Sequence, residues 1–229
     1  MSHRIYKQRL YGQFARVAQA LASDRRLELI DLLAQAPRHV EALATETEMS
    51  VANVSQHLQV LRAANLVETE RTGTRVTYRL AGDDVLSLWL GLRAVGTNRL
   101  PDIERIVQQF AVAGIEGTSI SADELAIRLA EGAVTLIDVR PPLEYDSGHL
   151  PGAISVPPGE MQQRLKGLPR DRPIVAYCRG GYCLFADEAV ALLRGEGVEA
   201  YRLDGGWPEW LVAGRAVARG VIGEPLRHF

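Results

Sequence analysis

One segment constrains the fold of this chain more than any other: Pro173-Ile-Val-Ala-Tyr-Cys178-Arg-Gly-Gly-Tyr-Cys183-Leu. The apolar run Ile174–Tyr177 is typical of a buried parallel strand, and an amphipathic helical pattern begins near Leu184. A strand, a glycine-bearing loop and a helix direct backbone N–H groups and the positive end of the helix toward one point. We therefore expect the thiolate of Cys178 to be stabilised there, with a pKa below about 8.5.

The composition is that of a globular protein long enough for two domains. The chain has 229 residues, 24% of them charged, and a formal net charge of −2; a domain usually has about 100–200 residues. No apolar run approaches the ~18 residues of a membrane span, and the polar N-terminus shows no secretory signal. Both cysteines lie in the loop, which favours reactive thiols in a reducing compartment over a disulfide scaffold. We expect a cytoplasmic protein with no membrane partner.

The first half is predicted to be helical. Apolar spacing predicts helices over residues 6–22, 24–36 and 40–47, and one over 51–65 that Ser50 caps. On the last of these, Val51, Val54, Leu58 and Leu61 share an apolar face. The amides that point away from that face are Asn53, Gln56 and Gln59. Amides can pair with adenine edges in the major groove, so DNA contact is one interpretation. A neutral surface helix is the other.

A hairpin is predicted directly after this helix. Alternating residues over 66–80 predict two strands joined at Thr72-Gly73-Thr74. Arg71 and Arg75 flank its tip, where their cations can reach phosphates or the minor groove. A basic hairpin that follows a helix-turn-helix pattern is typical of a wing.

The string Ser50-Val-Ala-Asn-Val-Ser-Gln-His-Leu-Gln-Val-Leu-Arg-Ala-Ala-Asn-Leu-Val67, with its wing, resembles the winged helix-turn-helix of ArsR-type bacterial repressors over roughly residues 8–110. The resemblance implies a homodimer on palindromic double-stranded operator DNA, with Ser55, Gln56 and His57 at or near the DNA. The helical pattern places His57 at the edge of the core face, so packing is equally open. The candidate DNA-binding residues are Ser50, Asn53, Ser55, Gln56, His57, Gln59, Arg71 and Arg75.

The sequence departs from the metal-sensing members of the ArsR-type repressors. Those proteins carry cysteine pairs near the start of the helix-turn-helix, or Asp and His sets on the last helix. Here residues 41–49 contain no cysteine and residues 83–110 contain no histidine. We expect no metal site and no cofactor, which leaves any sensing chemistry elsewhere in the chain.

A long apolar helical pattern over residues 83–113 follows, and Pro101 is expected to break or kink it. Its apolar stripe fits a dimer interface or packing against the first helix, and both can hold. Residues 113–119 are predicted to be a linker.

The second half alternates helices with strands. A helix over 122–131 and strands over 134–139, 154–156 and 174–177 predict a parallel α/β sheet covered on both faces. The cysteine loop would then lie at the carboxyl edge, where such sheets hold ligands.

Four motifs in this half resemble a rhodanese (sulfurtransferase) domain over roughly residues 117–216: Leu-Ile-Asp-Val-Arg-Pro, Gly-His-Leu-Pro-Gly-Ala, Cys-Arg-Gly-Gly-Tyr-Cys and Leu-Asp-Gly-Gly-Trp. The resemblance implies that Cys178 begins a six-residue active loop and carries transferable sulfur as a persulfide. The related phosphatases have a longer loop with an arginine at its end. Cys183 occupies the sixth position here, which argues against phosphate or arsenate chemistry. We expect a mostly α winged helix-turn-helix domain over 1–113 and a rhodanese-like α/β domain over 114–229.

The candidate catalytic residues are Cys178, Cys183, Arg179, Gly180, Gly181, Tyr182, Asp138 and Arg140. Arg179 either adds positive charge to the loop or is a surface arginine. Asp138 and Arg140 are expected to organise the neighbourhood of the loop rather than react. Cys183 either attacks the persulfide on Cys178 and closes a bridge, or fills space as a small residue.

Three functions remain open from the sequence. The first is a repressor whose rhodanese domain senses sulfane sulfur donors (polysulfide, persulfide or thiosulfate) at Cys178. The second is a sulfurtransferase that uses the winged domain mainly for dimerisation, so enzymatic turnover is undecided. The third is an arsenite sensor in which Cys178 and Cys183 act as a thiolate pair.

Overall fold

The structure is a computed structural model that describes residues 2–110, 112, 115, 117–220 and 224–225. It forms two compact units, Met1–Gly91 and Leu92–Phe229. The domain boundary expected between residues 113 and 114 lies outside the described residues and stays a prediction.

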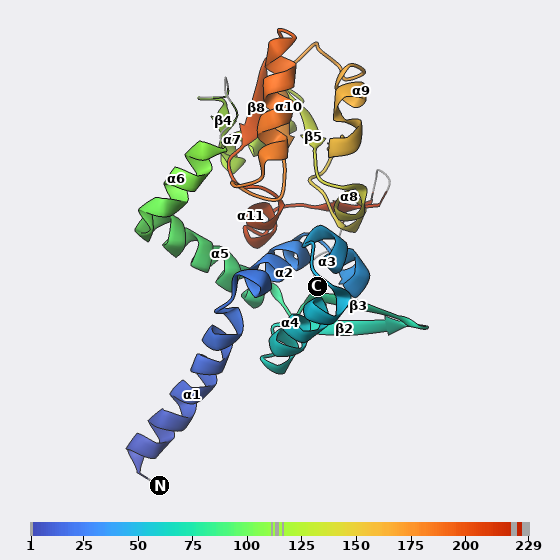
Figure 1. The fold of residues 1–229 in the computed structure, drawn as a ribbon. Coiled ribbons are helices and arrows are strands. Elements are labelled where there is room, and N and C mark those ends of the chain that lie inside the picture. The colour runs from blue at the N-terminus through green and yellow to red at the C-terminus, as the bar shows by residue number, and fades with distance from the viewer. Residues whose placement is uncertain (1, 111, 113–114, 116, 221–223, 226–229) are drawn as a thin grey trace. The chain divides into compact units, whose positions relative to one another are not determined.

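The first unit confirms the predicted helices and hairpin (Figure 1). Its elements are α1 (His3–Leu21), α2 (Asp24–Gln35), β1 (Arg38–His39), α3 (Val40–Glu46), α4 (Val51–Ala63), β2 (Val67–Thr72) and β3 (Arg75–Leu80). The three strands form one sheet in the order β1-β3-β2. The short strand β1 was not expected, because its two residues pair only with the distant β3 and have no strand pattern of their own.

Helix α4 begins as the sequence predicts. The Ser50 hydroxyl accepts a hydrogen bond from the Asn53 N–H at 3.2 Å and so satisfies one free donor of the first turn. Val54, Leu58 and Leu61 are fully buried against residues of α2 and α3. The expectation for Val51 was wrong, since this residue is 45% exposed. It is the first residue of the helix, and the buried face begins one turn later at Val54.

The β2–β3 hairpin has the predicted turn. Thr72 pairs with Arg75 across it, and Gly73 has a φ of +63°, a left-handed conformation that glycine adopts without steric cost. Arg71 and Arg75 are exposed beside this turn. The hairpin therefore presents two cations at its tip.

The predicted break at Pro101 is confirmed. Helix α5 (Asp83–Arg99) ends before Leu100, and α6 (Pro101–Gln109) begins at the proline, where a missing N–H costs nothing. Helix α5 begins in the first unit and ends in the second. Of its predicted stripe Leu86 is buried, whereas Leu92 and Val95 are exposed.

The second unit contains the expected parallel sheet. Its elements are β4 (Ser119–Ile120), α7 (Ala122–Ala130), β5 (Thr135–Asp138), α8 (Pro142–Ser147), β6 (Ile154–Ser155), the 3₁₀ turn η1 (Pro158–Glu160), α9 (Met161–Leu165), β7 (Ile174–Tyr177), α10 (Leu184–Gly195), β8 (Ala200–Leu203), α11 (Trp207–Val212), β9 (Ala218–Arg219) and β10 (Glu224–Pro225). Five parallel strands have the order β4-β8-β7-β5-β6. Ser119 belongs to edge strand β4, so the linker expected over 113–119 is shorter than predicted.

Helices cover both faces of this sheet (Figure 1). One core cluster packs Ile137, Ala176 and Cys178 against α9 and α10. The other packs Leu136 and Tyr177 against α7, α8 and α11. Successive strand residues alternate between the two clusters, as a pleated strand requires. Cys178 and Tyr177 therefore point to opposite faces.

Among the described residues, no helix combines the length and the apolar character needed to cross a bilayer.

Candidate functional site

The predicted cysteine loop joins β7 to α10. β7 is the middle strand of the sheet and ends at Tyr177, so Cys178 lies at the carboxyl end of a strand with a neighbour on each side. Cys183 is the residue immediately before α10. The expected arrangement of strand, loop and helix is confirmed.

Glycine is required at two points of this site. Gly180 has a φ of +142°, a conformation that other residues rarely adopt. A Cβ atom on Gly206 would lie 2.3 Å from the Cys178 carbonyl oxygen and 2.5 Å from the Gly180 nitrogen. The neighbouring Trp207 N–H donates to that same carbonyl at 3.1 Å. The glycine pair of the Leu-Asp-Gly-Gly-Trp motif thus allows the backbone before α11 to hold the start of the loop.

The two loop cysteines are joined. Cys178 and Cys183 form a disulfide bond, with their Cα atoms 6.1 Å apart, and Cys178 is 1% exposed. The Cys183 N–H also donates to the Gly180 carbonyl at 3.1 Å. A bridged sulfur does not titrate, so the lowered pKa of Cys178 stays a prediction for the reduced protein.

Arg179 points to a carboxylate that the sequence analysis did not single out. Its Nε donates to Glu144 Oε2 at 3.1 Å and its Nη2 donates to Glu144 Oε1. The Glu144 carboxylate, on α8, has no exposed surface. Much of the positive charge of Arg179 is therefore offset within the fold. No local pattern identifies Glu144 as the partner, because 35 residues separate the two in sequence.

The other half of the loop is held from β8. Arg202 Nη1 donates to Asp187 Oδ1 at 2.9 Å, and Nη2 donates to the Gly181 carbonyl at 3.4 Å. Asp187 lies in the first turn of α10 and is buried. Arg202 thus ties the middle of the loop to the helix that follows it. Tyr182, by contrast, is 44% exposed.

Asp138 and Arg140 lie together but apart from the sulfur atoms. Their side chains are fully buried and form a bidentate ion pair, and Arg140 Nη2 also donates to the Gly148 carbonyl at 2.7 Å. The Tyr177 hydroxyl donates to Asp138 and accepts from the Leu150 N–H at 3.0 Å. This network belongs to the sheet face opposite Cys178. A positioning role for Asp138 and Arg140 fits this placement and stays a prediction.

Burial and charge shift the protonation of this network. Burial, followed by the negative charge of Asp138, holds the pKa of Tyr177 well above its ordinary value of 10. Burial disfavours the charge on Arg140, but the adjoining Asp138 carboxylate outweighs it and raises the pKa of the guanidinium. Tyr177 is therefore a neutral donor and Arg140 a cation at any physiological pH.

Most of the predicted DNA-binding residues are exposed in the first unit. Asn53, Gln56 and Gln59 are exposed on α4, as expected from the helical pattern, and Ser55 and His57 are half-buried. Ser50 uses its hydroxyl to cap the helix. Contact of these residues, and of Arg71 and Arg75, with DNA stays a prediction.

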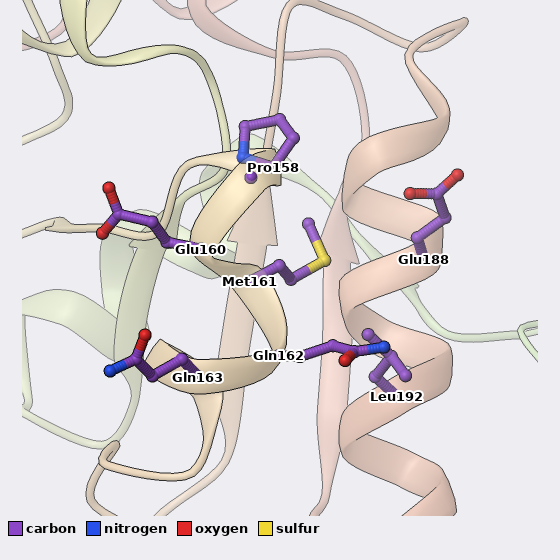
Figure 2. A pocket seen from close by; sticks show the side chains of 8 residues that line it. Pro158, Glu160, Met161, Gln162, Gln163, Glu188 and Leu192 are labelled. Carbon is purple, nitrogen blue, oxygen red and sulfur yellow. The ribbon is translucent and has the colours of Figure 1, made fainter.

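A shallow pocket of about 450 Å³ lies elsewhere in the second unit, between α9 and α10 (Figure 2). It is lined by Pro158, Gly159, Glu160, Met161, Gln162, Gln163, Glu188 and Leu192. None of these residues belongs to the cysteine loop. Within the part of the chain that the structure describes, no three His, Cys, Asp or Glu side chains gather as metal ligands would.

The fold and the loop define a winged helix-turn-helix protein with a rhodanese-like unit. Family models support both parts: "Bacterial regulatory protein, arsR family" matches residues 23–69 and "Rhodanese-like domain" matches residues 121–213.

The chain is 47% identical over 222 residues to the HTH-type transcriptional regulator Rv0324 of Mycobacterium tuberculosis, a match that covers 97% of this chain and 96% of that protein. It therefore belongs to the ArsR-family HTH-type transcriptional regulators that carry a C-terminal rhodanese domain.

Two partial matches accompany this one. A homodimeric winged helix-turn-helix DNA-binding domain of Mycobacterium bovis, solved by NMR as a fragment of residues 1–100, is 47% identical, with a TM-score of 0.41; the match covers 44% of this chain and 91% of the fragment. A tRNA sulfurtransferase of Desulfurococcus amylolyticus is 34% identical over 134 residues, which are 58% of this chain and 26% of that enzyme.

Proposed function

We propose that this regulator is a cytoplasmic, homodimeric repressor that senses sulfane sulfur at Cys178 and Cys183. The observation that carries the proposal is the pairing of both cysteines of the chain in one loop at the carboxyl edge of the rhodanese-like sheet. Because the two thiols are close enough to join directly, the loop has two covalent states. A regulator needs two such states, whereas sulfur transfer requires only Cys178.

The first step is sulfur capture. The reduced Cys178 thiolate attacks the outer sulfur of a persulfide R–S–SH and breaks its S–S bond. The leaving thiolate R–S⁻ takes up the proton of the transferred S–H group and departs as R–SH. Cys178 then carries the persulfide, Cys178–S–S⁻. Loop N–H groups and the start of α10 stabilise the negative charge, as in other anion sites at helix N-termini.

The second step closes the loop. The Cys183 thiolate attacks the inner sulfur of the protonated persulfide, the Sγ of Cys178, and hydrosulfide HS⁻ leaves. The two thiols are oxidised to a disulfide and the captured sulfur is reduced to sulfide, so the electrons balance. Two equivalents of a small thiol reduce the bridge to the Cys178 and Cys183 thiols, and the small thiols are oxidised to a disulfide.

Operator recognition is assigned to the first unit. The exposed amides of α4 suit the major groove, and Arg71 and Arg75 suit the flanking backbone. The dimer is assigned to apolar side chains that α1 leaves exposed in one chain: Ile5, Tyr6, Leu10, Tyr11 and Phe14. A helix with this much exposed apolar surface is typical of an interface.

The same first step would serve a sulfurtransferase, which is the second candidate. Bridge closure consumes the persulfide before it reaches an acceptor, so Cys183 favours the sensor over the enzyme. An enzyme would show steady turnover with thiosulfate or persulfide and an acceptor thiol, and replacing Cys183 by serine would raise that turnover.

The chemistry is tested by treating reduced full-length protein with polysulfide and analysing intact protein and peptides by mass spectrometry. We expect the Cys178–Cys183 bridge in the wild type and an accumulated Cys178 persulfide in Cys183→Ser. Persulfidation of Cys178 without any bridge in the wild type would contradict the two-state loop.

A further inference from the structure

The last turns of α5 contact the cysteine loop, and both partners lie in the second unit. Arg93 crosses the loop at Gly180, where a Cβ atom would lie 3.0 Å from Arg93 Nη2. The Arg93 Cζ atom lies 5.0 Å from the centre of the Tyr182 ring, and Nη1 lies 3.3 Å from Glu209 Oε1. Only 12% of the Arg93 side chain is exposed. A cation in this position attracts the ring face and holds Tyr182.

Thr97 holds the other end of the same tyrosine. Its hydroxyl is hydrogen-bonded to the Tyr182 hydroxyl, and it donates to the Arg93 carbonyl at 2.9 Å. Since the Thr97 proton is used in that second bond, Tyr182 is the donor in the first. Arg93 and Thr97 are four residues apart and share one helix face. Together they clamp the loop residue that directly precedes Cys183.

The same helix is anchored in the first unit. Val85 is buried in its core, and Trp89 Nε1 donates to Asp31 Oδ1 of α2 at 2.8 Å. Trp89 and Arg93 are four positions apart in sequence, which is about 6 Å along a helix axis. Helix α5 therefore contains residues of both units: Trp89 belongs to the first, and Arg93 and Thr97 belong to the second.

We propose that Arg93 and Thr97 are positioning residues that transmit the covalent state of the loop through α5 to the winged unit. This inference rests on the proposed function, because it names the route by which the loop acts on DNA binding. The bridge fixes Cys183, and Tyr182 is its neighbour, so the clamp is engaged in the bridged state. Opening the bridge frees Cys183 from Cys178 and changes the position from which Tyr182 meets Arg93 and Thr97. A packed helix responds to such a change as one element.

The test compares operator affinities of reduced and polysulfide-treated full-length protein, by fluorescence anisotropy at fixed salt. The variants are Tyr182→Phe, which removes the Tyr182–Thr97 hydrogen bond, Thr97→Val, which removes that bond and the one to the Arg93 carbonyl, and the double variant. Arg93→Lys keeps the charge but not the planar guanidinium and probes the ring contact independently. Tyr201→Phe is the matched control, because Tyr201 lies on β8 and its hydroxyl donates to Glu199. Mass spectrometry records bridge formation in every sample.

We expect Thr97→Val to form the bridge normally. In bridged Thr97→Val and bridged Tyr182→Phe, the change in operator affinity should be about fivefold smaller than in the wild type, since a net hydrogen bond is worth roughly that factor. The double variant should lose no more than Thr97→Val alone, because that change already removes the hydrogen bond to Tyr182. Bridged variants that respond as strongly as the wild type would overturn the route through α5. A wild-type protein that forms the bridge without any change in affinity would overturn the proposed function itself.

Discussion

Arg179 and Glu144 form a two-point ion pair in which the Glu144 side chain is fully buried and the Arg179 side chain is 19% exposed. The arginine of the cysteine loop is thus bound to α8, the helix after β5, and is largely shielded from solvent. The pair stabilises the loop in one conformation, because removing either charge removes a two-point charged contact with a buried carboxylate.

Replacing Glu144 by glutamine should therefore destabilise the second unit. We expect a loss of about 3 kcal/mol in the free energy of unfolding, because the partly buried Arg179 side chain loses the buried carboxylate that pairs with it. Urea unfolding of a Trp89→Phe background reports this unit, since the other tryptophans, Trp207 and Trp210, lie in it. Glu160→Gln is the matched control: its pair with Arg164 is half-exposed and should contribute less than about 1 kcal/mol. Equal effects of the two changes would contradict this account of the loop.

Gly206→Ala should disrupt the loop. The added methyl group would meet the Cys178 carbonyl and the Gly180 nitrogen, backbone atoms that cannot move aside without displacing the bridge. We expect a loss of several kcal/mol, about 3 or more, together with slower bridge formation. Gly195→Ala is the control, because nothing lies within 4 Å of its Cβ position at the end of α10. That variant should be neutral or gain up to about 1 kcal/mol.

The stability of the second unit should fall in alkaline solution. Burial first, and the Asp138 charge second, raise the pKa of Tyr177 in the folded state, so the folded protein keeps a proton that the unfolded chain loses above about pH 10. The stabilisation is complete below that pH and is lost as the pH rises through the folded pKa, with a slope approaching about 1.4 kcal/mol per pH unit. Tyr177→Phe should reduce this slope in urea unfolding measured across pH 9–11. An unchanged slope would assign the alkaline sensitivity to another group.

The wing and the recognition helix should contribute differently to DNA binding. If Arg75 contacts a phosphate as proposed, Arg75→Ala removes that cation, so affinity should fall for all sequences and the slope of log K against log salt should decrease by about 1. Gln56→Ala removes an amide from the exposed face of α4 and should weaken the operator by about 1–3 kcal/mol at unchanged salt slope. Arg170→Ala, an exposed arginine paired with Glu196 in the second unit, is the control. The assignment fails if Gln56→Ala weakens operator and unrelated DNA equally.

Local signals in the sequence were sufficient for much of the fold. The apolar run Ile174–Tyr177 has the bounds of β7, the Ser50 cap begins α4, and Pro101 begins α6. Each of these depends on a few adjacent residues: an unbroken apolar stretch, a capping hydroxyl, or an imino acid without an N–H. The short helices α8, α9 and α11 were missed because five or six residues hold too little periodicity to be recognised.

The partners of the loop could not be predicted in the same way. Glu144 reaches Arg179 from α8, and Arg93 and Thr97 reach Tyr182 from α5, across separations of 35 and 85 residues or more. Ion pairs and hydrogen bonds of this range depend on the packing of whole elements, which no local pattern encodes. The adjacent glycines of Leu-Asp-Gly-Gly-Trp were the one local sign of a close backbone approach.

The central claim is that the covalent state of Cys178 and Cys183 sets operator affinity. Its most direct test is an anisotropy titration of promoter DNA from the protein's own gene neighbourhood, with reduced and polysulfide-treated protein at one salt concentration. Cys178→Ser and Cys183→Ser are titrated in parallel. The account predicts a change of about tenfold or more in the wild type, a coupling typical of allosteric proteins, which both variants abolish. Tight operator binding that polysulfide leaves unchanged, while mass spectrometry shows the bridge, would contradict it.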